Sequence, residues 1–320
     1  MKFLNLLCWL FVFSNCDAQE SKLLINQKEI SDWSEYPIYP RLMDQNKGEW
    51  VNEFKYLDDI NVYGITYMSD GLKVNGLMVT PKKEGKYPCV IYNRGGNINF
   101  GSLVAAHGAT TLGKIAKEGY VVIASQYRGN AKSEGLEEFG GRDVNDVLNL
   151  IDVLEEVDKA NTDKIGMYGW SRGGMMTYIA LTQTDKIKAA IVGGAPSDLT
   201  VIDRPEMETK VYAELIPNYY ENKETELKKR SAIYFIDKFP KDVPILILHG
   251  NSDWRVKSTN SLKLALEFEK NRIPYRLKIF EGGDHGLSEH KEEVDLEVIN
   301  WLDKYLKYNY SLPDMEYHGR

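Results

Sequence analysis

From residue 62 onward, short apolar segments alternate with longer amphipathic ones. Residues 62–68 and 72–80 alternate apolar and polar side chains around Asp70 and Gly71, a pattern that predicts a β-hairpin. Runs that are apolar throughout are instead typical of parallel strands buried on both faces. Six short, mainly apolar runs of strand length follow the hairpin, at 88–92, 120–125, 165–168, 189–192, 245–248 and 275–280, and we expect them to be buried parallel strands.

Amphipathic helices are predicted between these runs, because apolar residues recur there at spacings of three and four. The three clearest sets are Val144, Val147, Leu148, Ile151, Leu154 and Val157; Leu262, Leu264, Ala265 and Phe268; and Val294, Val298, Ile299 and Leu302. Strands that alternate with helices form a mostly parallel sheet with right-handed crossovers and helices on both faces. The sequence therefore predicts a doubly wound α/β domain over residues 61–310, with the hairpin as an antiparallel edge.

The other segments lack this alternation. Residues 19–60 are rich in Trp, Tyr and Pro but have no clean period, and we expect them to wrap around the domain. Residues 199–240 interrupt the alternation with Pro, Tyr and charged residues, which indicates a small helical insertion over the carboxyl edge of the sheet. Residues 311–320 are interpreted as a tail.

The first 18 residues have the profile of a secretory signal peptide. Lys2 precedes an apolar stretch over 3–13, and polar residues follow. About ten apolar residues are too few for a bilayer span, which needs about twenty. We expect a periplasmic or secreted protein cleaved after Ala18, because a small residue precedes the cut. The alternative is a lipoprotein of the outer envelope anchored at Cys16, although the preceding residues match a lipidation motif poorly.

Charge and cysteine content exclude several classes of protein. The 40 Lys and Arg against 47 Asp and Glu give a net charge of −7, and no basic run offers a footprint for nucleic acid. Cys8, Cys16 and Cys89 have no paired spacing, which excludes a disulfide scaffold and a Cys-rich zinc module. His285 and His290 lack a carboxylate in helical register. We therefore expect no metal and no cofactor.

A candidate nucleophile lies between the predicted strand at 165–168 and a helical run at 175–181. Gly169, Ser171 and Gly173 form a G-x-S-x-G pattern there. In so tight a turn the nucleophile has a strained backbone, and its neighbours two positions away must lack side chains. Ser171 is a candidate catalytic serine because the motif lies between a predicted strand and a predicted helix; the G-x-S-x-G pattern alone would be weak evidence.

A serine hydroxyl needs a histidine base and a carboxylate that orients it. In sheets of this kind the order along the chain is serine, acid, histidine. Asp253 lies just past the predicted strand at 245–248, and His285 lies just past the one at 275–280. Asp284 is a rival acid, but adjacent residues in a loop rarely face one another. An oxyanion hole would use the N–H of Arg172 and one from the glycine-rich loop after residue 92.

The segment 164–196 resembles the nucleophile region of the prolyl oligopeptidase family of serine peptidases, which have the α/β-hydrolase fold. Tyr127-Arg128-Gly129, the helix with Asp146, and the segments 249–256 and 281–287 are similar to further family blocks, so that the resemblance covers about residues 60–307. It implies that Ser171, Asp253 and His285 form the catalytic triad.

Two departures from the family limit what the resemblance implies. Family peptidases usually carry a β-propeller before the catalytic domain, and this chain has no room for one. Arg94 stands where many relatives have Tyr or His, so the N–H of Gly95 becomes the expected second oxyanion donor. We expect substrate contacts from Arg94, from Tyr92 as a substitute hydroxyl, and from Trp170 and Trp254.

These observations predict an exported serine hydrolase that cleaves short peptides through an acyl-enzyme. The same triad also serves a carboxylesterase or deacylase that acts on small esters or acetylated sugars. A non-catalytic binding protein of the envelope is the third possibility, and the intact set of serine, acid and histidine argues against it.

Overall fold

The computed structural model describes residues 22–319. The predicted signal peptide at 1–18, with its alternative lipidation site Cys16, lies outside the described residues. Within them, no helix combines the length and the apolar character needed to cross a membrane.

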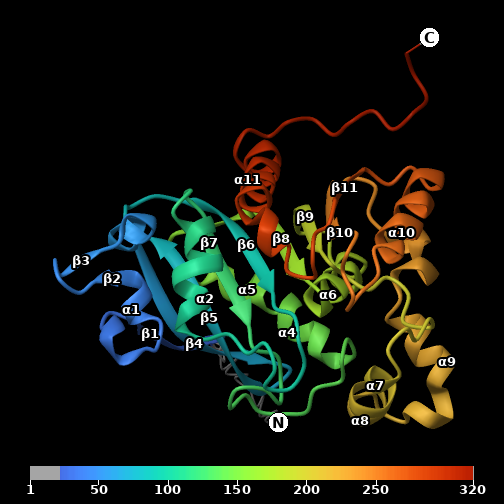
Figure 1. Ribbon diagram of the computed structural model, residues 1–320, viewed down its shortest axis with the longest axis horizontal. Helices are drawn as coiled ribbons and strands as arrows, with labels where there is room; N and C mark the ends of the chain where they lie inside the picture. Colours follow the sequence, from blue (N-terminus) through green and yellow to red (C-terminus); the bar gives the residue numbers. More distant parts are fainter. Residues whose placement is uncertain (1–21, 320) are drawn as a thin grey trace, which may run out of the picture.

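A single nine-stranded sheet runs through the centre of the molecule, in the order β1-β4-β5-β7-β6-β8-β9-β10-β11 (Figure 1). The pairs β1–β4, β4–β5 and β5–β7 are antiparallel, and all others are parallel. Its strands are β1 (Leu24–Glu29), β4 (Ile60–Ser69), β5 (Leu72–Pro81), β6 (Tyr87–Asn93), β7 (Val121–Ser125), β8 (Ala160–Trp170), β9 (Ile187–Gly193), β10 (Ile245–Gly250) and β11 (Tyr275–Phe280). A separate ribbon pairs β2 (Met43–Asp44) with β3 (Glu49–Trp50).

Helices cover both faces of this sheet (Figure 1). They are α1 (Tyr39–Leu42), α2 (Ala105–His107), α3 (Gly113–Ala116), α4 (Asn145–Leu148), α5 (Leu150–Glu155), α6 (Arg172–Leu181), α7 (Pro205–Met207), α8 (Ala213–Leu215), α9 (Tyr219–Lys229), α10 (Thr259–Lys270) and α11 (Lys291–Leu302). A π-helical turn, Gly108–Leu112, joins α2 to α3. The predicted α/β-hydrolase architecture, a mostly parallel sheet between helices, is confirmed.

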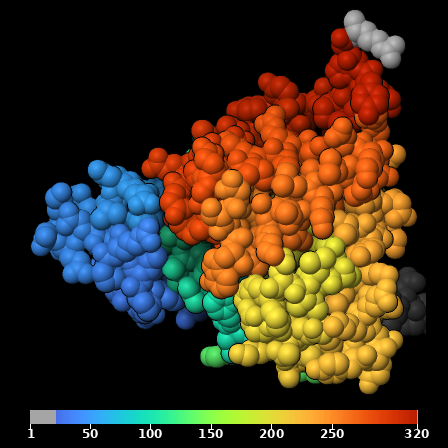
Figure 2. Space-filling model, turned by 45° about the vertical axis from the view of Figure 1, so that its right-hand side comes forward, coloured from blue at the N-terminus to red at the C-terminus, as the bar shows by residue number. Residues whose placement is uncertain are grey.

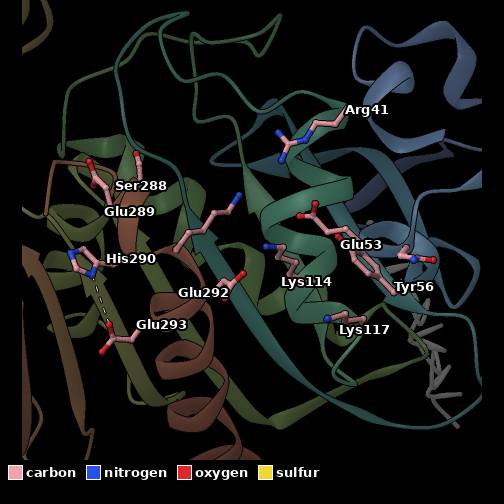
Figure 3. A pocket seen from close by; sticks show the side chains of 12 residues that line it. Arg41, Glu53, Tyr56, Lys114, Lys117, Ser288, Glu289, His290, Glu292 and Glu293 are labelled. Atoms are coloured by element: carbon pink, nitrogen blue, oxygen red, sulfur yellow. Dashed lines mark ion pairs between the residues drawn. The ribbon is translucent and has the colours of Figure 1, made fainter. Parts of the chain in front are cut away.

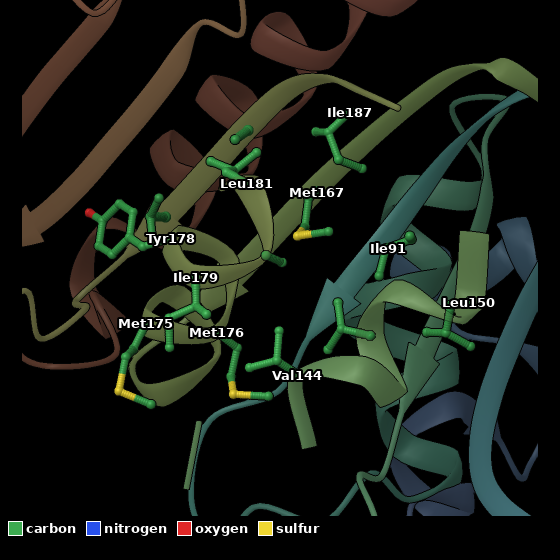
Figure 4. Close-up of a cluster of buried hydrophobic side chains, with 14 of the residues drawn as sticks. Ile91, Val144, Leu150, Met167, Met175, Met176, Tyr178, Ile179, Leu181 and Ile187 are labelled. Atoms are coloured by element: carbon green, nitrogen blue, oxygen red, sulfur yellow. The ribbon is translucent and has the colours of Figure 1, made fainter. Parts of the chain in front are cut away.

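Successive side chains of the central strands enter two different hydrophobic cores. In β6, Cys89 and Ile91 pack in the core that contains α4, α5, α6 and α10 (Figure 4), whereas Val90 and Tyr92 pack in the core that contains α2, α3 and α11. A strand buried on both faces needs apolar residues at every position. This is why the central parallel strands contain continuous apolar runs in the sequence. The expectation of full burial is wrong for β11, which lies at the edge of the sheet, where only Phe280 is buried.

No pattern in the sequence predicts β1, which lies at the edge of the sheet. Only Leu24 of this strand is buried, and its other five residues are exposed, so the strand has no alternation to detect. Its backbone pairs with β4, and the Glu156 carboxylate accepts hydrogen bonds from the N–H groups of Leu23 and Leu24 at 2.6 and 2.9 Å. Backbone pairing and one carboxylate therefore hold a segment that we had expected only to wrap around the domain.

The span 199–240 contains α7, α8 and α9 and forms the yellow mass beside the orange C-terminal half in Figure 2. Arg230 anchors its end, since the guanidinium donates to the carbonyls of Phe139 and Glu138 at 2.9 and 3.0 Å. This span borders the carboxyl edge of the sheet, where the candidate catalytic residues follow β8, β10 and β11. The division of the chain at residues 61 and 310 stays a prediction.

Candidate active site

Ser171 lies in a sharp turn between β8 and α6. Its φ of 56° and ψ of −124° lie outside the regions that L-residues commonly occupy. A Cβ atom on Gly169 would lie 2.2 Å from the carbonyl oxygen of Gly173, and one on Gly173 would lie 1.9 Å from that of Asn93. Both positions therefore require glycine, and the turn presents the Ser171 hydroxyl at the carboxyl edge of the sheet.

The structure brings Ser171, His285 and Asp253 together in one line of hydrogen bonds. His285 Nε2 lies 2.9 Å from Ser171 Oγ, and His285 Nδ1 lies 2.7 Å from Asp253 Oδ2. The acid follows β10 and the histidine follows β11, so adjacent parallel strands bring them to the same edge. This is the geometry in which an imidazole can take a proton from a serine hydroxyl while a carboxylate fixes its tautomer.

Hydrogen bonds keep the Asp253 carboxylate ionised. Burial alone would raise its pKa, but hydrogen bonds from His249, His285 and the N–H of Val256 outweigh burial and hold the pKa well below its usual range. The N–H groups of Arg255 and Val256 donate to Oδ1 at 2.8 and 3.0 Å. Asp253 is therefore held as an anion that can stabilise an imidazolium on His285.

His249 also contacts this acid, a contact that was not predicted from the sequence. His249 is fully buried, and its Nε2 lies 2.8 Å from the Val256 carbonyl oxygen and 3.3 Å from Asp253 Oδ2. Its Nδ1 lies 2.6 Å from Ser261 Oγ. The signal in the sequence was a histidine at the end of β10, four residues before the acid. His249 supports the loop that holds Asp253.

The carboxylate of the rival acid Asp284 makes no hydrogen bond with His285 within the described residues. Its Oδ1 accepts hydrogen bonds from the N–H groups of Gly286 and Ser288 at 2.9 and 3.0 Å, and its Oδ2 accepts one from Ser288 Oγ at 3.1 Å. These bonds fold the loop that carries His285. Asp284 is thus a turn residue, and the geometry favours Asp253 as the acid.

Two backbone N–H groups beside Ser171 are free to bind an oxyanion. Gly95 packs against the nucleophile, since a Cβ atom placed there would lie 3.2 Å from Ser171 Cβ and 3.9 Å from its Oγ. Among residues 22–319, no acceptor receives a hydrogen bond from the N–H of Gly95 or of Arg172. Both predicted donors are therefore available next to the nucleophile.

A cavity of about 390 Å³ opens at the triad. Trp254, 66% exposed, lies at its rim, where Arg204 and Arg255 stack on the indole at 5.0 and 5.4 Å. Most of the apolar lining comes from the 199–240 span: Leu199, Val201, Ile202, Met207, Val211 and Tyr212. Trp254 and this span therefore line the cavity, and their contact with a substrate stays a prediction.

The other expected substrate contacts are not found. Arg94 is 1% exposed, and its guanidinium donates to the backbone carbonyls of Gly95, Ile98, Phe100 and Gln126. Tyr92 is buried edge-on against Tyr168. The ring of Trp170 packs against Gly193, and its Nε1 donates to the carbonyl of His285 at 2.8 Å. Arg94, Tyr92 and Trp170 therefore support the loops of the site and do not line the cavity.

A larger depression of about 1030 Å³ lies elsewhere, between the N-terminal segment, α3 and the start of α11 (Figure 3). Its lining is mostly charged and includes Lys114, Glu293 and His290, the last two 3.8 Å apart. None of the triad residues lines it. Within residues 22–319, no three His, Cys, Asp or Glu side chains converge as metal ligands do.

Comparison with known proteins agrees with this geometry. Residues 108–309 match the model of the prolyl oligopeptidase family. An uncharacterized Bacillus subtilis peptidase, YtmA, is 30% identical over 221 residues, which are 67% of this chain and 82% of that protein. Dipeptidyl-peptidase 5 of Porphyromonas gingivalis is 25% identical over 238 residues, which are 70% of this chain and 34% of that protein.

Solved structures show the same relationship. An acylaminoacyl peptidase of Pyrococcus horikoshii superposes with a TM-score of 0.70 at 26% identity, over 86% of this chain and 46% of that one. The chain thus spans most of one relative but less than half of the other two. With a family match over most of its length, a peptidase relative at 30% identity and the serine–histidine–aspartate geometry, the chain belongs to the prolyl oligopeptidase family of serine peptidases.

Proposed function

We propose that this serine peptidase cleaves short peptides through an acyl-enzyme formed on Ser171. The observation that carries the proposal is the hydrogen-bonded line from Ser171 Oγ through His285 to Asp253, with contacts of 2.9 and 2.7 Å. No other group is needed to make the hydroxyl a nucleophile.

The chemistry follows from the geometry. His285 Nε2 takes the proton of Ser171 Oγ as the oxygen attacks the peptide carbonyl, and Asp253 stabilises the resulting imidazolium. The N–H groups of Gly95 and Arg172 bind the oxyanion of the tetrahedral intermediate. His285 then gives the proton to the leaving amine, whose C–N bond breaks. Water, deprotonated by the same imidazole, attacks the ester carbonyl and releases the acid.

The cavity supports a short substrate with an apolar acyl residue. Its volume of about 390 Å³ is in the lower range of cavities that hold small ligands. Leu199, Ile202 and Val211 supply apolar lining on one side of it. Two of the similar proteins are a dipeptidyl-peptidase and an acylaminoacyl peptidase, which supports a peptide rather than an ester as the substrate.

A labelling and substrate experiment tests the proposal. We expect a fluorophosphonate probe to add one phosphonyl group, found on the peptide that contains Ser171. We also expect the unlabelled enzyme to hydrolyse peptide anilides with an apolar acyl residue. Turnover of nitrophenyl esters alone would identify a carboxylesterase or deacylase instead. Failure of the folded protein to react with the probe would support a non-catalytic binding protein.

We also propose that the protein is exported from the cell. The support for export is Lys2, the apolar stretch 3–13 and the small residue Ala18. We expect N-terminal sequencing of the protein recovered from the native host's medium or periplasm to begin at Gln19. A mature chain that begins at a lipid-modified Cys16 would show a lipoprotein, and an unprocessed chain that retains Met1 would contradict export.

A further inference from the structure

The loop that carries Gly95 has an unfavourable backbone. Gly96, Ile98 and Gly101 have φ values of 77°, 48° and 78°. Positive φ is tolerated by glycine, but in a β-branched residue such as Ile98 it is strained. A Cβ atom on Gly96 would lie 2.0 Å from the carbonyl oxygen of Phe100, so the loop is also tightly closed. Other groups must hold this loop in place.

The carboxylate of Glu137 holds the strained residue directly. Its Oε2 accepts a hydrogen bond from the N–H of Ile98 at 2.8 Å, and its Oε1 pairs with Nη1 of Arg172. The same Nη1 donates to the carbonyl of Gly96 at 3.0 Å. Glu137 therefore bridges the loop to the residue that directly follows the nucleophile.

The surroundings make this bridge rigid. Glu137 is 8% exposed and Arg172 is 3% exposed, and the second nitrogen of the guanidinium, Nη2, pairs with buried Asp143. The guanidinium also stacks on the rings of Tyr127 and Phe139, each at 4.9 Å. Buried charges with this many partners have one favourable arrangement, and removing one partner is costly.

We propose that Glu137 is a positioning residue of the oxyanion hole. It holds the N–H of Gly95 beside Ser171 and in register with the N–H of Arg172, so both donors reach one oxygen. The donor nitrogens of an oxyanion hole lie about 2.7–3.1 Å from the oxyanion. A displacement of a donor by about 1 Å can lower the rate about 100-fold. This inference rests on the proposed function, because an oxyanion forms only during acyl transfer.

The test is Glu137→Gln, which keeps the size of the side chain and removes its charge. We expect kcat for a peptide anilide to fall about 10- to 100-fold, with KM within about threefold. The affinity for a peptide aldehyde should fall in parallel with kcat/KM, because its tetrahedral adduct uses the oxyanion hole. The affinity for the corresponding peptide acid should stay unchanged. Fluorophosphonate titration and the melting temperature give the fraction of folded, active enzyme.

Glu138→Gln is the matched control. Glu138 is similarly buried, at 7% exposed, but it pairs with Arg142 instead of the loop, and we expect kcat within twofold of the parent. A kcat of E137Q within twofold of the parent, or equal losses of aldehyde and acid affinity, would overturn the inference. Should E137Q not fold, Glu137→Asp, too short to reach both partners, is judged by the same measurements. If the parent itself neither binds the probe nor cleaves anilides, the proposed function fails instead.

Discussion

Ser171→Ala is expected to lower kcat by about 10⁶-fold, the size of effect known for removal of the nucleophile from other serine peptidases. Without Oγ no acyl-enzyme can form, and only the oxyanion donors and substrate binding remain to accelerate the reaction. The fold should not change, because the side chain of Ser171 forms no hydrogen bond with any described residue other than His285. The measurement is kcat on a peptide anilide, together with the melting temperature.

Ser252→Ala is the control for this variant. Ser252 is exposed and adjacent to Asp253, and its side chain has no hydrogen bond with the described residues. We expect its kcat to equal that of the parent. A Ser171→Ala enzyme that retains more than about 1% of the parental kcat, after purification away from contaminating peptidases, would rule out Ser171 as the nucleophile.

Much of the fold could be predicted because the central parallel strands are buried on both faces. Val90 and Ile91 face opposite cores, so the strand has to be apolar throughout and is visible in the sequence. Edge strand β1 faces water along most of its length and has no such signal. Of the strands that precede the candidate catalytic residues, β8 and β10 contain buried apolar runs, whereas only Phe280 of β11 is buried.

The triad could be predicted for a related reason. Its three residues each follow a strand of the parallel part of the sheet, and parallel strands end at one edge, so the order of strands almost determines which loops meet. Strand order does not determine side-chain direction. Arg94 and Trp170 lie in the right loops, but Arg94 turns inward to backbone carbonyls and Trp170 supports the His285 loop.

Long-range charge pairing was the part least accessible to sequence reasoning. Arg172 was expected to contribute only its backbone N–H. Its side chain reaches Glu137 and Asp143, 35 and 29 positions earlier in the chain. No period or spacing links these residues, because the loops that carry them are brought together by the packing of α4 against α6. Such partners become visible only once the fold is known.

Asp253→Asn is expected to lower kcat by about 10⁴-fold while the protein stays folded. The carboxylate accepts a hydrogen bond from Nδ1 of His285, which leaves Nε2 free to take the proton of Ser171. An amide at this position can donate its N–H to Nδ1, and this favours the tautomer whose Nε2 is already protonated. Because the pKa of Asp253 lies well below its usual range, the parental carboxylate stays ionised wherever His285 acts as a base. The measurement is kcat across neutral and alkaline pH.

Asp284→Asn separates the two acids next to His285. The carboxylate of Asp284 accepts hydrogen bonds from Gly286 and Ser288 and has none with His285 within the described residues, so its replacement should change kcat by no more than about threefold. The hydrogen bonds to the Asp253 carboxylate oppose its protonation. The parent enzyme should therefore not lose activity through protonation of Asp253 until the pH falls toward the lowered pKa of this carboxylate. If Asp284→Asn were the more damaging of the two variants, the acid would be misassigned and the line from Ser171 to Asp253 would not be the catalytic one.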